Sequence, residues 1–425
     1  MLREILVYTS VYIGLFAVVY FFLSFILNRK RVQELQENEL PTVSVIIPAY
    51  NEESSIKETV LSALNSNYPK QKLEIIVVDD GSRDETYQIA KRIKEQRLRV
   101  FTKQNAGKAS ALNYGIAKSK GEIIITMDAD TFAEKDAVKK IIRYFSNPKI
   151  MCVTPSMAVH EPKGLLSRIQ QIEYLFGVYL RKAFASMNAI HVTPGAFSAY
   201  RKSFFTRYGG FEVGNITEDM EMSLRIQLNN FGIECSEDAV VYTKAPRTFV
   251  SLLKQRRRWN FGLAKNLWHY RALFSRKYGE LGTIVLPIAV ITILLPIFMT
   301  VYLSIISLIR LQKELSLFES INFNFSNLFD VNKFVFERFF FVFFSNPVSI
   351  FLVLFMLLLI GYMFFAKKRV QKYSNVKLSI FFFLAFYSLL FAFWWLVAFF
   401  YVVFIGKVAW GKNKIGKYKN GRKYG

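Results

Sequence analysis

The stretch "LEIIVVDDGS" at residues 73–82 decides the fold that this sequence predicts. It begins as a run of mostly aliphatic side chains and changes abruptly to aspartates, a glycine and a serine. A short apolar run that ends in turn-forming residues is typical of a strand buried on both faces. Such strands belong to sheets that helices cover on both sides. The stretch therefore predicts an α/β domain with acidic side chains at the end of a buried strand.

Similar apolar stretches predict further strands at residues 42–50, 98–104 and 121–130. Segments with helical spacing separate them, at residues 52–66, 84–96 and 108–119. This alternation predicts a mostly parallel, Rossmann-like sheet. Ligands of such sheets bind beyond the carboxyl ends of the strands. The polar motifs fall at those ends: Asn51-Glu52, Asp79-Asp80 and Asp128-Ala129-Asp130.

The composition of the 425 residues combines a net charge of +24 with 52% hydrophobic residues. A basic balance by itself fits nucleic acid, an anionic membrane surface or a phosphate-bearing substrate. Long apolar runs favour the membrane and argue against nucleic acid. The only cysteines, Cys152 and Cys235, are too few for a disulfide framework or a zinc cluster.

Four runs carry no charged residue, and each exceeds the roughly 20 residues that cross a bilayer as a helix. They are residues 5–27, 281–309, 339–366 and 378–406. The first run lacks a small-residue cleavage site and is followed by the basic segment 28–31, which predicts an anchor and not a signal peptide. We therefore expect a multi-pass integral protein of the plasma membrane.

Basic residues beside membrane spans mark the cytoplasmic side. By this rule the N-terminus lies outside, residues 28–280 lie inside, and residues 310–338 lie outside. The basic segments 367–377 and 407–425 both indicate the inside. Four crossings that start outside end outside, which contradicts the charge of the tail. A bent or re-entrant run, a run with two passes and a tail that departs from the rule remain alternatives.

Composition divides the chain into five segments. They are an N-terminal span with its basic stop (1–31), a cytoplasmic α/β domain (40–245), amphipathic interface helices (246–280), a C-terminal membrane region (281–406) and a basic tail (407–425).

Common phosphate-binding loops are absent. Around Lys108 a Walker loop fails at both ends, with Thr102 in place of glycine and Ala109 in place of the hydroxyl residue. No dinucleotide fingerprint follows the first strand. What remains is Asp128-x-Asp130, which has the oxygen ligands for a hard divalent ion that bridges a diphosphate. Strand-end acids that accept loop N–H groups are the alternative.

The Asp79–Ser82 segment has a similar alternative, because an acidic turn followed by a helix N-cap would use the same residues. Taken together, these acids and Lys108 converge on one sheet edge and favour a nucleoside-diphosphate site. Farther along the chain, Thr217 is expected to cap a helix that has Glu218 and Asp219 in its first turn. Asp219 is also a candidate general base, and both interpretations are compatible.

The segment "QRRRW" at residues 255–259 lies in a stretch whose composition suits a helix at the membrane interface. On a helix, Gln255, Arg258 and Trp259 share one face. That face offers an amide, a guanidinium for phosphate and an aromatic plate for a sugar ring. Arg256 and Arg257 are expected to point elsewhere, toward lipid headgroups.

Between about residues 41 and 275 the chain resembles membrane-integrated, inverting family 2 glycosyltransferases, especially poly-N-acetylglucosamine, hyaluronan and cellulose synthases. The resemblance rests on motifs in family order: "VSVIIPAYNEE", "VVDDGSRDET", "NAGKASALNYGI", "MDADT", "RIQQIEYLFG", "TPGAFSAYRKS", "ITEDMEMSLRI" and "KQRRRW". It implies a GT-A-type domain that uses Mg²⁺ or Mn²⁺ and a UDP-sugar donor.

The resemblance also implies residue roles. The UDP part of the donor would bind Pro48, Tyr50, Glu52, Asp79, Asp80, Lys108 and Asp128. Asp128 and Asp130 would form the metal-binding DxD motif, with Asp130 as the direct ligand. Asp219 would be the base. The acceptor and diphosphate would contact Glu218, Gln255, Arg258 and Trp259.

The expected function is transfer from UDP-GlcNAc or UDP-glucose to a growing β-linked polysaccharide, processive and coupled to export. Membrane lipids and accessory membrane subunits are the expected partners. The segment after Trp259 matches neither the cellulose nor the hyaluronan synthase pattern, so the sugar stays open. A non-processive enzyme that makes a glycolipid or lipid-linked saccharide is the alternative, and a catalytically silent scaffold is a third possibility, which the intact acidic set argues against.

Overall fold

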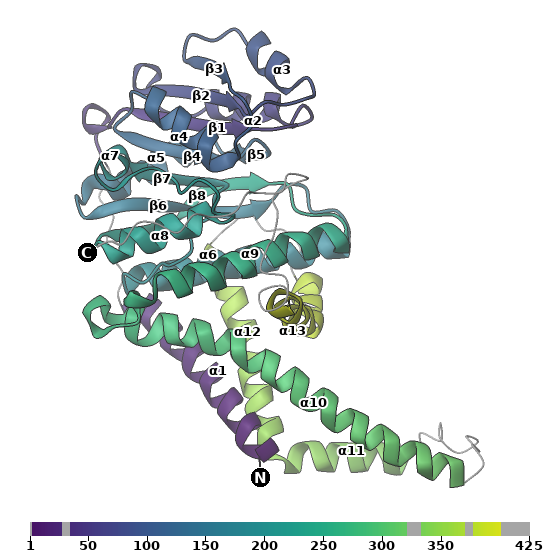
Figure 1. Cartoon of the computed structure of the whole chain (residues 1–425). Coiled ribbons are helices and arrows are strands. Elements are labelled where there is room, and N and C mark those ends of the chain that lie inside the picture. The colour runs from purple at the N-terminus through teal and green to yellow at the C-terminus, as the bar shows by residue number, and fades with distance from the viewer. Residues whose placement is uncertain (1, 28–34, 321–332, 370–376, 401–425) are drawn as a thin grey trace.

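A computed structural model describes residues 2–27, 35–320, 333–369 and 377–400. An α/β domain lies at one end, and long helices extend from its underside (Figure 1). The basic segment 28–31 and the tail 407–425, whose charges indicate the inside in the sequence, lie outside the described residues.

The first four strands are where the sequence predicts them. They are β1 (Val43–Ala49), β2 (Leu73–Asp79), β3 (Leu98–Thr102) and β4 (Ile123–Met127). β1 pairs in parallel with β2 and β4, and β2 pairs in parallel with β3. The predicted helices between them are α2 (Ile56–Leu64), α3 (Thr86–Arg92) and α4 (Lys108–Lys118). All four strands therefore end on one edge of the sheet.

Four more strands extend the sheet: β5 (Thr131–Ala133), β6 (Ile150–Val159), β7 (Phe197–Arg201) and β8 (Gly232–Thr243). The order is β3-β2-β1-β4-β7-β6-β8-β5. β7 runs antiparallel to β4 and β6, while β6 and β8 are parallel. The parallel character that the sequence predicts is thus strongest in the first half of the sheet.

Both faces of the sheet are buried, as the apolar strands require. Along β1, Ile47 packs with α2 and with α5 (Ala137–Ile142), whereas its neighbour Ile46 packs on the other face with α4 and α7 (Lys202–Tyr208). Successive strand residues point to opposite faces, which explains this division. α8 (Glu218–Leu228) covers the second face with Ile226.

Two long helices lie between this domain and the membrane helices. They are α6 (Gly164–Ser186) and α9 (Phe249–His269). A second apolar cluster joins Leu175 of α6 and Leu267 of α9 to Phe25 of α1 (Leu2–Leu27) and Met363 of α12 (Pro347–Arg369). Side-chain packing therefore joins α6 and α9, next to the α/β domain, to the long apolar helices α1 and α12.

Among the described residues, three helices are long and apolar enough to cross a membrane: Ile5–Leu27, Leu281–Lys313 and Pro347–Phe365. Pro296 lies inside α10 (Leu286–Ser320) without ending it. The prediction of one run over 339–366 is wrong in one respect. The chain breaks at Asn346 between α11 (Lys333–Ser345) and α12, because a proline at the first helical position starts a new helix.

The fourth predicted run is only partly described, as α13 (Lys377–Phe400), and residues 401–406 lie outside the described part. In Figure 1 α13 is seen along its axis, while α1 and α12 run down the page. α13 packs against α9 and α6. Its axis is therefore turned away from the direction of α1 and α12.

Candidate active site

A large cavity of about 2180 Å³ begins at the carboxyl ends of β1 and β4 and extends to the membrane helices. Charged and polar side chains line its upper part, between the sheet edge, α8 and α9. A membrane-side chamber continues it between α1 and α12, lined by Gly14, Ala17, Val18, Leu352, Phe355, Met356, Leu359 and Met363. One space thus joins the predicted motifs to the predicted spans.

Twelve predicted site residues line this cavity: Pro48, Tyr50, Glu52, Asp80, Lys108, Asp128, Asp130, Glu218, Asp219, Gln255, Arg258 and Trp259. Asp79 is not among the lining residues. Its carboxylate accepts hydrogen bonds from the Thr102 hydroxyl at 2.8 Å and from the Ser82 N–H at 3.3 Å. Asp79 therefore closes the strand-end turn, which is one part of the alternative interpretation; the helix N-cap that it also requires is not formed within Asp79–Ser82, because α3 begins after Glu85.

Asp80 holds the loop that leads to α4. Its carboxylate accepts a 2.7 Å hydrogen bond from the N–H of Gly107 and pairs with Lys103 Nζ at 2.7 Å. Gly107 has φ of 91°, a conformation that glycine adopts at little cost. These contacts fix the start of α4, and with it Lys108.

Lys108 joins two acidic motifs that are far apart in the sequence. Its Nζ lies 2.5 Å from Asp128 Oδ1 and 3.6 Å from Glu218 Oε1. Burial alone would lower the pKa of Lys108, but the neighbouring carboxylates, Asp128 first, raise it overall. The lysine therefore stays charged and balances acids from β4 and α8.

Asp130 has more negative charge around it than Lys108 neutralises. Burial, followed by the charges of Asp128 and Glu52, raises the pKa of Asp130 to about 7. In the described residues, no group of three or more His, Cys, Asp or Glu side chains has the arrangement of a metal site. Mg²⁺ is commonly held by one or two carboxylates plus substrate phosphates. Asp128 and Asp130 therefore fit a hard divalent cation that arrives with a diphosphate.

Asp219 lies in the first turn of α8 and faces the same cavity. The Met220 N–H donates to its Oδ1 at 2.8 Å, and the Thr193 hydroxyl donates to its backbone carbonyl at 2.8 Å. Burial, and then the charge of Glu218, raises the pKa of Asp219 to about 6. A carboxylate with this proton affinity is suited to general-base chemistry near neutral pH.

The expected cap of this helix differs from the prediction. α8 does begin after Thr217, but the Thr217 side chain makes no capping hydrogen bond. Its hydroxyl accepts from Asn266 Nδ2 at 3.0 Å, and Asn266 Oδ1 accepts from Asn215 Nδ2 at 3.0 Å. Thr217 is therefore used for a contact with α9, and the charge of Glu218 remains as the favourable feature at the helix start.

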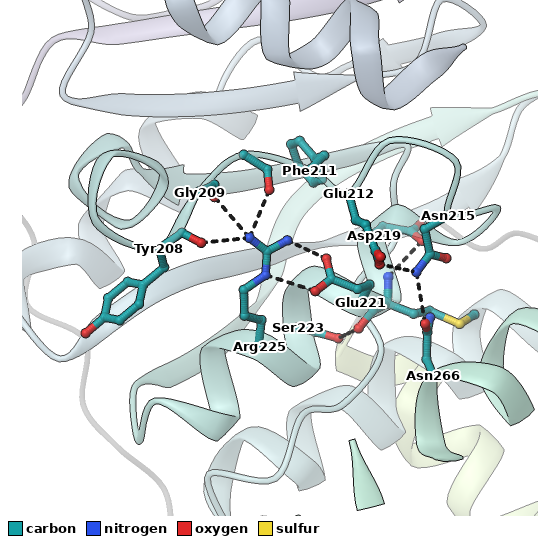
Figure 2. A network of polar contacts seen from close by, with 12 residues as sticks. Tyr208, Gly209, Phe211, Glu212, Asn215, Asp219, Glu221, Ser223, Arg225 and Asn266 are labelled. Atoms are coloured by element: carbon teal, nitrogen blue, oxygen red, sulfur yellow. Dashed lines mark hydrogen bonds and ion pairs between the residues drawn. The ribbon is translucent and has the colours of Figure 1, made fainter. Parts of the chain in front are cut away.

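Figure 2 shows how α8 is held from behind. The Arg225 guanidinium donates to the carboxylate of Glu221 at 2.5 and 2.9 Å and to the carbonyls of Tyr208, Gly209 and Gly210. Tyr270, just after α9, donates its hydroxyl to Glu221. These buried contacts fix the orientation of the helix that carries Asp219.

The "QRRRW" segment lies within α9, and one expectation about it is wrong. Arg256 does not face lipid: it is 3% exposed and pairs with Glu173 of α6 at 2.5 Å. Arg257 lines the cavity together with Arg258 and Trp259. The segment therefore belongs to the protein interior and the cavity wall, because α6 and α13 pack against α9.

Sequence reasoning missed several residues of the site. Gly195 lies so close to the side-chain ends of Asp219 and Lys108 that an added methyl group would make one of them shift. Lys103 holds Asp80, and Tyr174 and Tyr387 line the cavity. Gly195 belongs to the motif "TPGAFSAYRKS", one of those on which the family resemblance rests. Nothing in the sequence linked Tyr387 to the catalytic domain.

Residues 44–209 match the family model described as Glycosyl transferase family 2. The chain carries a glycosyltransferase family 2 domain. The similarity continues beyond this domain, since a curated Staphylococcus aureus protein (strain COL) is 31% identical over 264 residues. That alignment covers 60% of this chain and 63% of the relative, whose name is poly-beta-1,6-N-acetyl-D-glucosamine synthase. A Staphylococcus epidermidis protein of the same name is 31% identical over 271 residues, covering 62% and 65%.

The glycosyltransferase family 2 domain also has the predicted fold class. The solved mannosyltransferase from Pyrobaculum calidifontis in complex with GDP-Man and Mn²⁺ aligns with a TM-score of 0.53 and 22% identity. The alignment covers 63% of this chain and 75% of the mannosyltransferase chain. At this identity the likeness concerns the fold alone. The prediction of a GT-A-type sheet domain is confirmed, and three candidate membrane helices accompany it in the described residues.

Proposed function

We propose that this protein transfers a sugar, with inversion, from a UDP-sugar to a growing β-linked polysaccharide. N-acetylglucosamine is the sugar we favour, because the two relatives above are named poly-beta-1,6-N-acetyl-D-glucosamine synthase. One observation carries the proposal: a single cavity joins the acids of β4, Asp219 and the Gln255, Arg258 and Trp259 face of α9. Donor, base and acceptor face would thus meet in one space.

In this mechanism Asp219 accepts the proton of the acceptor hydroxyl. The freed oxygen forms a bond to C1 of the donor sugar from the face opposite the diphosphate. The bond between C1 and the diphosphate oxygen breaks, and UDP leaves with that electron pair. Lys108 and Arg258 both line the cavity and would supply positive charge for the departing diphosphate. The attack from the opposite face gives a β-linkage from an α-linked donor.

Asp128 and Asp130 are the residues that would hold Mg²⁺ or Mn²⁺. When bound, the ion would neutralise charge on the diphosphate. Without it, Glu52, Asp128 and Asp130 crowd negative charge at the sheet edge, which the raised pKa of Asp130 reflects. Their own contribution is to bind and orient the charged end of the donor.

Export of the product is part of the proposal. The cavity continues from the acceptor face into the membrane-side chamber, which gives a growing chain a direction to leave. Three crossings by α1, α10 and α12, with the N-terminus outside, would leave the catalytic domain in the cytoplasm. They would also bring the basic tail inside, which agrees with its charge.

A second candidate function has its own supporting observation. The membrane-side chamber is lined by glycine, alanine, valine, leucine, methionine and phenylalanine. Sugar hydroxyls would find few hydrogen-bond partners there, whereas an acyl chain would fit by apolar contact. This lining favours a lipid-linked acceptor, so that transfer to a glycolipid is the alternative to polymer synthesis.

One experiment separates these functions. The full chain is purified in detergent and given Mn²⁺ or Mg²⁺ with labelled UDP-GlcNAc or UDP-glucose. Polymer synthase activity predicts a high-molecular-mass product that a hydrolase specific for β-1,6-linked N-acetylglucosamine degrades. A product that extracts entirely into chloroform–methanol after a single addition would refute polymer synthesis. No use of any nucleotide sugar would refute both functions.

A further inference from the structure

Arg256 lies at the centre of a buried contact between α6, α9 and α13. Its Nη2 donates to Glu173 Oε2 at 2.5 Å, and Tyr387 of α13 donates its hydroxyl to Glu173 Oε1 at 3.0 Å. One carboxylate of α6 therefore holds a cation of α9 and a hydroxyl of α13. Glu173 and Tyr387 also line the cavity, so the contact forms part of its wall.

The guanidinium of Arg256 also lies over two indole rings. Its Cζ is 4.2 Å from the ring centroid of Trp259 and 5.6 Å from that of Trp394 in α13. Trp394 is buried, and Trp259 lines the cavity. Cations bind the face of tryptophan more strongly than other aromatic faces, and more so when water is excluded. Arg256 thus connects the cavity-facing indole to a fixed indole of α13.

We propose that Arg256, Glu173 and Tyr387 form a positioning network that fixes Trp259 at the acceptor side of the cavity. The inference rests on the proposed function, in which Trp259 faces the acceptor. A buried ion pair is a poor source of stability, because apolar side chains of similar volume often stabilise as well or better. The planar guanidinium of Arg256, however, sets the orientation of each group that it touches. We therefore attribute the buried charges of Arg256 and Glu173 to the positioning of Trp259, and not to the stability of the fold.

The network acts on one of two competing reactions. Transfer to a sugar requires an acceptor hydroxyl held beside Asp219, whereas hydrolysis requires only water at that place. A displacement of about 1 Å costs on the order of 100-fold in the rate of a reaction between positioned groups. A loosened Trp259 should therefore lower transfer far more than hydrolysis, and the ratio of the two rates reports positioning.

The test uses the purified full chain and labelled UDP-GlcNAc. Sugar in the acceptor product and free sugar released by water are measured in the same reaction. Tyr387→Phe removes one hydroxyl, and the double variant Glu173→Gln/Arg256→Met removes both buried charges together. We expect each to lower the transfer-to-hydrolysis ratio by about tenfold or more, while the KM for the donor stays within about twofold. Arg256→Lys, which keeps the charge without the planar fork, should fall between wild type and the double variant.

Controls exclude a loss of fold. Removing both partners leaves no unpaired buried charge, so the double variant should keep its thermal midpoint within a few degrees. Lys265→Met removes an exposed cation from the same helix and should keep the wild-type ratio. A wild-type ratio in the folded double variant would overturn the inference, and so would an equal fall of transfer and hydrolysis. If the wild-type chain uses no nucleotide sugar, the proposed function itself fails.

Discussion

Gly262 of α9 packs directly against Thr217, the residue before the helix that carries Asp219. A Cβ added at residue 262 would stand 2.2 Å from Thr217 Oγ1, far inside van der Waals contact. α9 therefore contacts the Thr217 side chain, just before α8, through a position that has no room for a Cβ. The position of the candidate base depends on the packing of α9, and not only on the catalytic domain.

The first prediction concerns this contact. Gly262→Ala should push the Thr217 loop away and displace Asp219, because overpacking a tight site costs about 1–3 kcal/mol. We expect the transfer rate to fall by about tenfold or more, measured with labelled donor in detergent. Gly361→Ala, in α12 with open space around it, is the matched control and should retain activity. Equal activity of the two variants would show that the contact does not position the base.

A second prediction concerns Gly195. An added Cβ would lie 2.7 Å from Asp219 Oδ2 and 3.0 Å from Lys108 Nζ. Gly195→Ala should therefore displace the base and abolish most transfer, while the fold, followed by the thermal midpoint, changes little. Gly177→Ala in α6 is the control, because the new methyl group would make only a 3.4 Å contact with Arg181 and should displace nothing. Full activity in Gly195→Ala would contradict the assigned place of Asp219.

The third prediction concerns pH. Asp219 must be ionised to accept a proton, and burial raises its pKa to about 6. The rate should therefore rise with pH along an acidic limb centred near pH 6, measured as kcat/KM. Enzyme held at each pH and returned to pH 7.5 should recover, which separates titration from unfolding. A limb centred near pH 4 would mean that the base is not buried among acids.

The same raised pKa predicts an effect on stability. A carboxyl group that holds its proton more tightly when folded destabilises the protein once pH exceeds its unfolded pKa, and the full cost is present above the folded value. Asp219→Asn should thus abolish transfer yet raise the thermal midpoint at pH 7.5. A lowered midpoint would instead indicate that Asp219 stabilises the fold.

The fifth prediction concerns the metal. Chelation by EDTA should abolish transfer, and Mn²⁺ or Mg²⁺ should restore it. Asp130→Asn should raise the Mn²⁺ concentration needed for half-maximal activity by about tenfold or more, because Asp128 would be the only remaining proposed protein ligand. Glu58→Gln, an exposed acid on α2, controls for net charge. Full activity in EDTA would remove the ion from the mechanism.

The sequence could predict the first half of the sheet because Val45, Ile47 and their equivalents in β2 and β4 form short aliphatic runs with polar ends. Some lining residues could be predicted because they follow those strands or share a helix face, and others, such as Pro48 and Tyr50, only because the motifs resemble a known family. Arg256 could not, since its partner Glu173 is 83 residues away and three arginines in a row resemble a wet surface. Pro347 could have indicated the break at Asn346, but the apolar residues on both sides made residues 339–366 resemble one continuous helix.

The place of α13 has a consequence for how the protein is made. It follows every other described element in the chain, yet Tyr387 and Phe391 complete the wall beside Trp259. The α/β domain emerges from the ribosome well before this helix is synthesised. We therefore expect a nascent chain to bind donor while its acceptor wall is still missing. Transfer by the proposed mechanism would then begin only after α13 has been synthesised and has packed in place.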